Sequence, residues 1–168
     1  GVVPQPGCFG SGIFPAFRMN TSQKQLEDRI LSREWFYEIP LPSGKFTRSY
    51  LPDFAKTIHT GREKMLFDFL GPHVKDDWQN LRCLDLACHE GYFALKLALK
   101  GCRSVVGMDV RTEHLENAEL IRQVHELENL EFAKGDIQKL DASVPGVFNI
   151  VLVFGILYHV HDLIGTLR

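Results

Sequence analysis

The sequence predicts an α/β protein whose core is a doubly wound, mostly parallel sheet. From residue 82 onward short apolar segments alternate with helical segments, the order that lays parallel strands side by side under crossover helices. The segment 148–155 is almost wholly apolar, which is typical of a strand in the middle of a parallel sheet. Residues 112–128 carry apolar side chains at helical spacing, which predicts an amphipathic crossover helix. The 168 residues, 45% hydrophobic and 24% charged, suffice for one such domain.

An irregular arm and a short helix are expected first. Residues 1–20 are rich in Gly and Pro and show no periodicity, which predicts an irregular arm. Ser22 and Gln25 fit a capping box, so a short helix is expected over 23–34. The aromatic, β-prone segment 35–39 then predicts a strand, ended by the prolines and the glycine that follow it.

A second helix is expected after this strand. Thr60 and Glu63 fit another capping box, and Gly71 followed by Pro72 is expected to stop the helix. Its inward side chains are expected to be Met65, Leu66, Phe69 and Leu70.

The remaining elements form the strand and helix series. Strands are expected over 82–87, 104–110, 130–137 and 148–155. Helices are expected over 91–100 and 112–128, with a last one beginning at Asp162. Ligands of such sheets bind at the carboxyl ends of the strands, so the loops after the four strands are the candidate sites.

The first candidate loop joins strand 82–87 to helix 91–100. It contains Asp85, a small residue at Ala87 and a glycine at Gly91, which would let the main chain approach a ligand closely. The free N–H groups at the start of the next helix can bind a carboxylate. The alternative is a tight strand-to-helix turn that binds nothing.

The second and third candidate loops each carry one carboxylate. Asp109 follows Asp85 by 24 residues, close to the ~20 expected between a glycine-rich turn and an acid that accepts ribose hydroxyls. The alternative role of Asp109 is to cap the next helix. Asp136 can accept the exocyclic amine of adenine while Ile137 packs on the ring. An ordinary Asx turn is the alternative there.

The fourth loop follows the most apolar strand. Gly155, after Phe154, allows close main-chain approach to a ligand, and His159 is a candidate general base. A packed or helix-capping histidine is the alternative for His159. His161 lies two residues further on, and residues two apart on a helix diverge, so these histidines are not expected to form a metal site.

Composition excludes several classes of function. The net charge of −2 gives no electrostatic case for nucleic-acid binding, and no DNA partner is expected. No apolar run approaches the ~20 residues that span a membrane. The four cysteines, Cys8, Cys83, Cys88 and Cys102, include no C-x-x-C pair, so neither zinc nor a redox motif is expected. Cys83 and Cys102 are expected to be buried apolar residues. A cytoplasmic location is the default expectation.

Taken together, the four loops resemble those of class I S-adenosylmethionine (SAM) dependent methyltransferases. "LDLACHEGYFAL" matches the first motif of that family, and "VVGMDV" resembles its ribose-acid strand. "FAKGDI" resembles the adenine strand, and "FNIVLVFGILYHVHD" is similar to the fourth motif. The resemblance covers residues 61–168. No G-x-G-x-x-G follows the first strand, which disfavours an NAD-binding protein.

The resemblance implies a Rossmann-like fold, SAM as cofactor, S-adenosylhomocysteine (SAH) as product, and no metal. The residues implied to bind the cofactor are Asp85, Ala87, Cys88, His89, Gly91, Tyr92, Asp109, Val110, Asp136, Ile137, Phe154 and Gly155. One departure stands out, because the family usually has G-x-G-x-G in the first loop. Ala87 and His89 occupy the first two of these glycine positions, and the bulky His89 falls beside the methionine end of SAM.

The resemblance also extends to the N-terminal part. "REWFYEIPLPSG" is similar to the cap that covers the cofactor cleft in a subset of these enzymes, so residues 1–60 are expected to form an arm and cap, and 61–168 the SAM-binding domain. "GILYH" is similar to bacterial tRNA wobble-uridine carboxymethyltransferases, which use a carboxylated SAM. The family sheet has seven strands and only four are expected here, so the chain is expected to be truncated after strand four. Its exposed strand edge would then favour self-association.

The expected function is transfer of a methyl group from SAM to a small-molecule or RNA acceptor, with no membrane partner. Two alternatives stay open: a SAM-binding module or fragment that does not catalyse, and a nucleotide-binding oxidoreductase.

Overall fold

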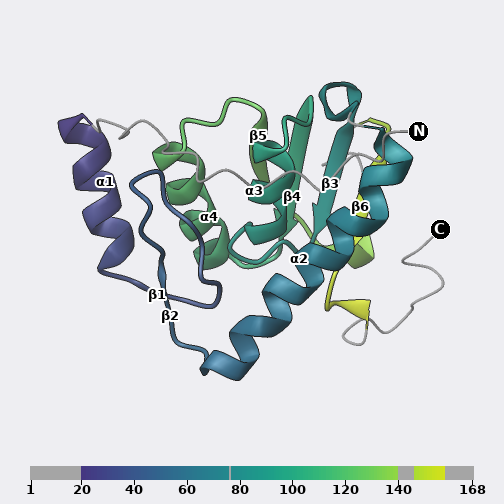
Figure 1. Ribbon diagram of the computed structural model, residues 1–168. Coiled ribbons are helices and arrows are strands. Elements are labelled where there is room, and N and C mark those ends of the chain that lie inside the picture. Colours follow the sequence, from purple (N-terminus) through teal and green to yellow (C-terminus); the bar gives the residue numbers. More distant parts are fainter. Residues whose placement is uncertain (1–19, 76, 140–145, 158–168) are drawn as a thin grey trace, which may run out of the picture.

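The computed structural model describes residues 20–75, 77–139 and 146–157, and its centre is a four-stranded parallel sheet (Figure 1). The strands are β3 (Arg82–Leu86), β4 (Ser104–Asp109), β5 (Leu130–Lys134) and β6 (Ile150–Val153), in the spatial order β5–β4–β3–β6. The chain therefore moves outward from β3 to β5 and returns to the other side of β3 as β6. The resulting switch point, between β3 and β6, is where open α/β sheets bind ligands. The predicted α/β fold class is confirmed.

Two helices and two short 3-10 turns accompany these strands. α3 (Tyr92–Leu99) and α4 (Thr112–Val124) are the crossover helices after β3 and β4, and the 3-10 turns are η1 (Trp78–Asn80) and η2 (Ile137–Lys139). Side chains alternate along the strands, so Cys83 packs in the large cluster with α3 and α4, while Leu84 belongs to a smaller cluster of four buried residues. The buried positions of Cys83 and Cys102, at 0% and 1% exposure, confirm their predicted role.

The N-terminal part consists of α1 (Thr21–Leu31), a two-stranded parallel ribbon of β1 (Glu34–Trp35) and β2 (Arg48–Ser49), and α2 (Asp53–Val74). Figure 1 shows α1 and the ribbon at one side of the molecule, and α2 running from the ribbon towards the side of β3 and β6. α1 packs on α4, so the cap is fastened to the sheet domain through a helix pair. Within the described residues, no helix has both the length and the apolar character needed to cross a membrane.

The first helix begins earlier than predicted, because a different residue caps it. Asn20 Oδ1 accepts the Gln23 N–H at 2.8 Å, and Gln23 Oε1 accepts the Asn20 N–H at 3.0 Å. This reciprocal pair is the true capping box, so the predicted box of Ser22 and Gln25 is wrong. The predicted strand 35–39 is also too long, because β1 ends at Trp35. The main-chain N–H groups that follow donate to side-chain oxygens instead of to a neighbouring strand.

The second helix is longer than predicted at both ends. It begins after Pro52 at Asp53, and the Thr60 hydroxyl donates to the carbonyl of Thr57 inside the helix, so the predicted cap at Thr60 is wrong. Pro72 lies inside the last turn of α2, which ends two residues later at Val74, so the predicted stop is early. The helix thus crosses the boundary expected between residues 60 and 61.

The prediction of which face of α2 packs inward was half right. Leu66 is buried and Leu70 packs against the core, as predicted. Met65 and Phe69 are 72% and 65% exposed, and Phe67 packs inward in their place.

The strand and helix series from residue 82 follows the prediction closely. Each strand begins within two residues of its predicted start, and the predicted helices 91–100 and 112–128 correspond to α3 and α4, both somewhat shorter. Nothing is described for residues 1–19, including Cys8, or for the helix predicted from Asp162.

Candidate cofactor-binding site

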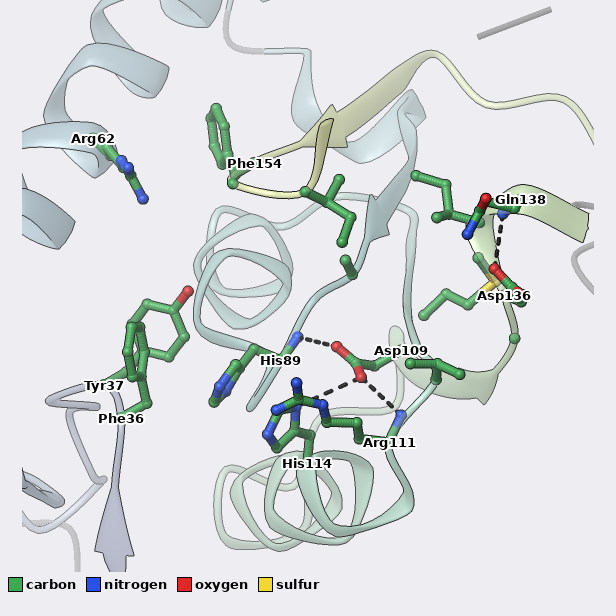
Figure 2. A pocket seen from close by; sticks show the side chains of 17 residues that line it. Phe36, Tyr37, Arg62, His89, Asp109, Arg111, His114, Asp136, Gln138 and Phe154 are labelled. Carbon is green, nitrogen blue, oxygen red and sulfur yellow. Dashed lines mark hydrogen bonds and ion pairs between the residues drawn. The ribbon is translucent and has the colours of Figure 1, made fainter. Parts of the chain in front are cut away.

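A cavity of about 480 Å³ lies at the carboxyl ends of the strands (Figure 2). Its lining includes residues from each of the four predicted loops: Ala87, His89, Asp109, Val110, Asp136, Ile137, Phe154 and Gly155. Pockets for small molecules usually measure 300–1,000 Å³, so the volume suits a nucleoside-sized ligand. The fold therefore brings together in one site residues that lie up to 68 positions apart.

Four of the predicted site residues do not line this cavity. Asp85 is 2% exposed and accepts the Ala94 N–H at 3.1 Å, so it holds the start of α3, and burial raises its pKa to about 7. Cys88 is buried behind the loop. Gly91 and Tyr92 pack against the sheet and the cap.

Gly91 is required by both conformation and space. Its φ of +78° lies in the left-handed region, and a Cβ there would stand 2.6 Å from the ring of Phe132. Gly107 on β4 meets the same ring, since a Cβ on it would lie 2.7 Å away. The two glycines therefore let the first loop pack closely on the sheet around Phe132.

Asp109 is the most firmly held polar group of the cavity. The residue is 7% exposed, and one carboxylate oxygen accepts the His89 N–H while the other accepts the Arg111 N–H, both at 2.9 Å. His114 Nδ1 lies 3.5 Å from the same carboxylate. Arg111 is the residue that precedes α4, and no side chain caps that helix, so Asp109 is not its cap. Each carboxylate oxygen has a further lone pair to offer a ligand hydroxyl.

His89 has an unusual backbone for a side chain of its size. Its φ is +54°, a region that glycine adopts freely, and its imidazole stacks on that of His114 with ring centroids 3.6 Å apart. Burial, followed by the neighbouring His114, lowers the pKa of His89 to about 4. The ring is therefore neutral near pH 7 and adds no positive charge beside Asp109.

Asp136 and Ile137 lie at the other end of the cavity. Asp136 Oδ1 accepts the Gln138 N–H at 2.9 Å, which is the Asx turn considered as its alternative role. The second carboxylate oxygen has no hydrogen bond among the described residues, so the turn and a ligand contact are compatible. Ile137 opens η2 and is 8% exposed, with its side chain against Leu84 and Met108.

The cap forms one wall of the cavity, and the sequence did not predict which cap residues line it. Phe36 and Tyr37 from the cap and Arg62 from α2 face the cavity on the side opposite Asp136 (Figure 2). The cap motif indicated that aromatic residues cover the cleft, although no signal singled out Arg62. Further lining residues missed by the sequence reasoning are Met108, Arg111, His114, Gly135, Gln138 and Ile156.

Two remaining predictions concern the general base and a metal site. His159, the candidate general base, lies outside the described residues. In the described ranges, no group of three or more His, Cys, Asp or Glu side chains is placed to hold a metal ion.

Comparison with known proteins assigns the family. The family model described as "Methyltransferase domain" matches residues 77–168, more than half of the chain. The chain belongs to this methyltransferase family. Together with the SAH-bound structure below, the match confirms the predicted family, class I SAM-dependent methyltransferases, its fold and its cofactor type.

Two curated relatives illustrate the breadth of the family. A tRNA U34 carboxymethyltransferase of Trichodesmium erythraeum is 29% identical over 107 residues, which cover 64% of this chain and 32% of that protein. A ubiquinone biosynthesis O-methyltransferase of Neisseria meningitidis is 27% identical over 113 residues, 67% of this chain and 46% of that protein. The chain thus spans 32% and 46% of the length of these two relatives.

A solved structure extends the likeness into the cap. The N-terminal domain of EvdMO1 with SAH bound matches with a TM-score of 0.57 and 26% identity, covering 83% of this chain and 55% of that one. This coverage exceeds what residues 77–168 alone provide, so the likeness includes part of the N-terminal region.

Proposed function

We propose that this chain is the cofactor-binding part of a methyltransferase that transfers a methyl group from SAM to a small-molecule or RNA acceptor. The observation that carries the proposal is the convergence of the four predicted loops on one cavity at the switch point. The cavity holds an acid at the end of β4 and a second acid after β5, the two groups that a nucleoside's ribose and adenine require.

The lining residues set the direction in which SAM would lie. Adenine would lie between Asp136 and Ile137, and the ribose hydroxyls would donate to Asp109. The amino-acid end would then point towards the cap, where Arg62 lines the cavity. Arg62 makes no ion pair or hydrogen bond within the described part of the chain, so its guanidinium is available to the donor's carboxylate.

The aromatic wall suits the reacting end of the donor. When bound, SAM supplies an electrophilic methyl group on a positively charged sulfur. The rings of Phe36 and Tyr37 offer π-electron density to such a cation and exclude water from it. The acceptor's nucleophilic atom forms its bond to the methyl carbon as the carbon–sulfur bond breaks, and the acceptor's proton leaves to a base. His159 remains the proposed base.

The relatives suggest two broad classes of methyl acceptor. One relative is named for a tRNA position and another for ubiquinone biosynthesis, so both RNA and small molecules remain in the proposal. Since the chain spans less than half of either relative, we propose that these 168 residues bind SAM but transfer little or no methyl on their own.

Binding and turnover measured together test this function. Calorimetry should show that the chain binds SAH and SAM and does not bind NAD. A parallel assay with radiolabelled SAM and mixed tRNA or phenolic acceptors should show little or no product. Binding of NAD in preference to SAH would favour an oxidoreductase, and full turnover would show that no further sheet is needed.

Self-association is a separate proposal. β6 pairs only with β3 among the described strands, so its outer edge offers unpaired main-chain groups. Light scattering should show dimers or larger species that become monomeric when Val151 on β6, itself 49% exposed, is replaced by lysine. A monomeric parent chain would refute this proposal.

A further inference from the structure

The first loop holds the cap through three different contacts. The ring of His89 lies 4.8 Å from that of Phe36, and the ring of Tyr92 stacks on that of Tyr37 at 5.0 Å, measured between centroids. Between them, Glu90 Oε2 accepts the main-chain N–H groups of both cap residues, at 2.9 Å from Phe36 and 3.2 Å from Tyr37. One short segment therefore sets the position of the two cap residues that line the cavity.

Glu90 is the contact on which the others depend. β1 ends at Trp35, so the next two N–H groups have no strand partner, and within the described chain they donate to Glu90. A buried N–H without an acceptor is strongly unfavourable. Glu90 is itself only 4% exposed, and its second oxygen lies 3.4 Å from Asn117 Nδ2 on α4. The carboxylate is thus fixed at both oxygens.

The network joins the cap to the proposed donor site. Asn117 Oδ1 accepts a hydrogen bond from Arg33, which lies just before β1, so cap and α4 meet again at this residue. On the other side, the N–H of His89 donates to Asp109, the proposed ribose acid. Neighbouring residues of the loop therefore connect the ribose site with the aromatic wall.

We infer that Glu90 is a positioning residue that holds Phe36 and Tyr37 over the amino-acid end of the methyl donor. The inference rests on the proposed function, because it assigns the wall to that end of SAM. Glu90 does not line the cavity. It acts by fixing the main chain of the cap, and so it controls how long the donor or its product stays bound.

The variants are chosen to separate this role from general stability. Glu90→Ala removes both acceptors, whereas Glu90→Gln keeps one side-chain oxygen that can accept from both N–H groups. Glu27→Gln is the matched control, because Glu27 is a buried carboxylate of the cap, 2% exposed, that pairs with Lys45 and does not line the cavity.

The first measurement needs no ligand. Hydrogen exchange followed by NMR should show the Phe36 and Tyr37 amides exchanging at least about tenfold faster in Glu90→Ala than in the parent chain. The Val105 amide, which donates to Asn129 at the sheet, serves as the internal reference and should change much less. Unchanged exchange at Phe36 and Tyr37 would overturn the inference, whatever the chain binds.

The second measurement compares SAH with adenosine, which lacks the amino-acid end. Glu90→Ala should weaken SAH binding about tenfold, mainly through faster dissociation, and adenosine binding less than about threefold. Glu90→Gln and Glu27→Gln should stay within about threefold of the parent for both ligands. Equal losses for the two ligands, or no loss of SAH affinity, would overturn the inference. A parent chain that binds neither ligand would instead overturn the proposed function.

Discussion

Replacing Asp109 separates its two roles, as a support of the loop and as the proposed acceptor of ribose hydroxyls. Its carboxylate accepts two backbone N–H groups at 2.9 Å each, from His89 and Arg111. A hydrogen bond to a charged group contributes about 1.5–3 kcal/mol. Asp109→Ala should therefore lower the free energy of unfolding by roughly 3–6 kcal/mol, and Tm by roughly 6–24 °C for a chain of this size. Asp109→Asn keeps one oxygen and should lose less.

The same variants should weaken binding of SAH at least about tenfold, since the ribose bonds are lost in addition. Calorimetry with adenosine and 2′,3′-dideoxyadenosine distinguishes this loss from loosening of the loop. The parent should prefer adenosine, and Asp109→Asn should lose most of that preference, because the amide keeps one neutral acceptor oxygen in place of two charged ones and its nitrogen cannot accept a hydroxyl. Asp68→Ala is the control, since Asp68 forms only an exposed ion pair with Lys64. A folded Asp109→Asn variant that still discriminates the two nucleosides as the parent does would refute the assignment.

Three further predictions concern the rest of the cavity. Asp136→Asn should lose discrimination between SAH and its inosine analogue, because the carboxylate no longer reads the exocyclic amine; equal discrimination in calorimetry would leave Asp136 a turn residue only. Arg62→Ala should weaken SAH binding about tenfold with adenosine binding unchanged, and Arg62→Lys should recover part of the loss; a parallel loss for adenosine would contradict the contact with the carboxylate. The pKa of His89 is about 4 in the folded chain, below its ordinary value, so the unfolded chain takes up a proton first and stability falls as pH drops from about 6.5 towards 4. Urea unfolding of His89→Asn, which tolerates the left-handed backbone, should show roughly 1–2 kcal/mol less of this fall at pH 5, and identical pH profiles would contradict the shifted pKa.

The sheet domain was predictable from the sequence because its signals are local. β3, β4 and β6 are short, largely apolar segments, and α3 and α4 carry apolar stripes that face the sheet, patterns that need no tertiary information. The acids at Asp109 and Asp136 come directly after strands, so the topology alone predicts that they meet at one edge.

The cap was less predictable, because tertiary contacts decide its elements. The capping box predicted at Ser22 had suitable residue types, but the helix begins directly after Asn20, which is its N-cap. Pro72 reads as a stop signal, yet α2 continues for two residues beyond it, to Val74. Which face of α2 packs inward depends on how the helix lies across the core. Residue spacing alone does not decide whether Met65 or Phe67 packs against the core.

The site was predicted where it follows strands and missed where it comes from elsewhere. Arg62 reaches the cavity from a helix that precedes the sheet, and His114 enters it because one turn of α4 faces Asp109. Neither residue carries a sequence signal, since a charged residue on a helix is usually solvated. Three-dimensional proximity is the information that the sequence reasoning lacked.

A crystal structure of this chain with SAH bound tests the central claim most directly. The account predicts SAH in the cavity of Figure 2, with both ribose hydroxyls within hydrogen-bond distance of Asp109 and adenine beside Asp136 and Ile137. The amino-acid carboxylate should point to Arg62 beneath the aromatic wall. SAH bound in another place or in the reverse direction, with its adenine against the cap, would contradict the account.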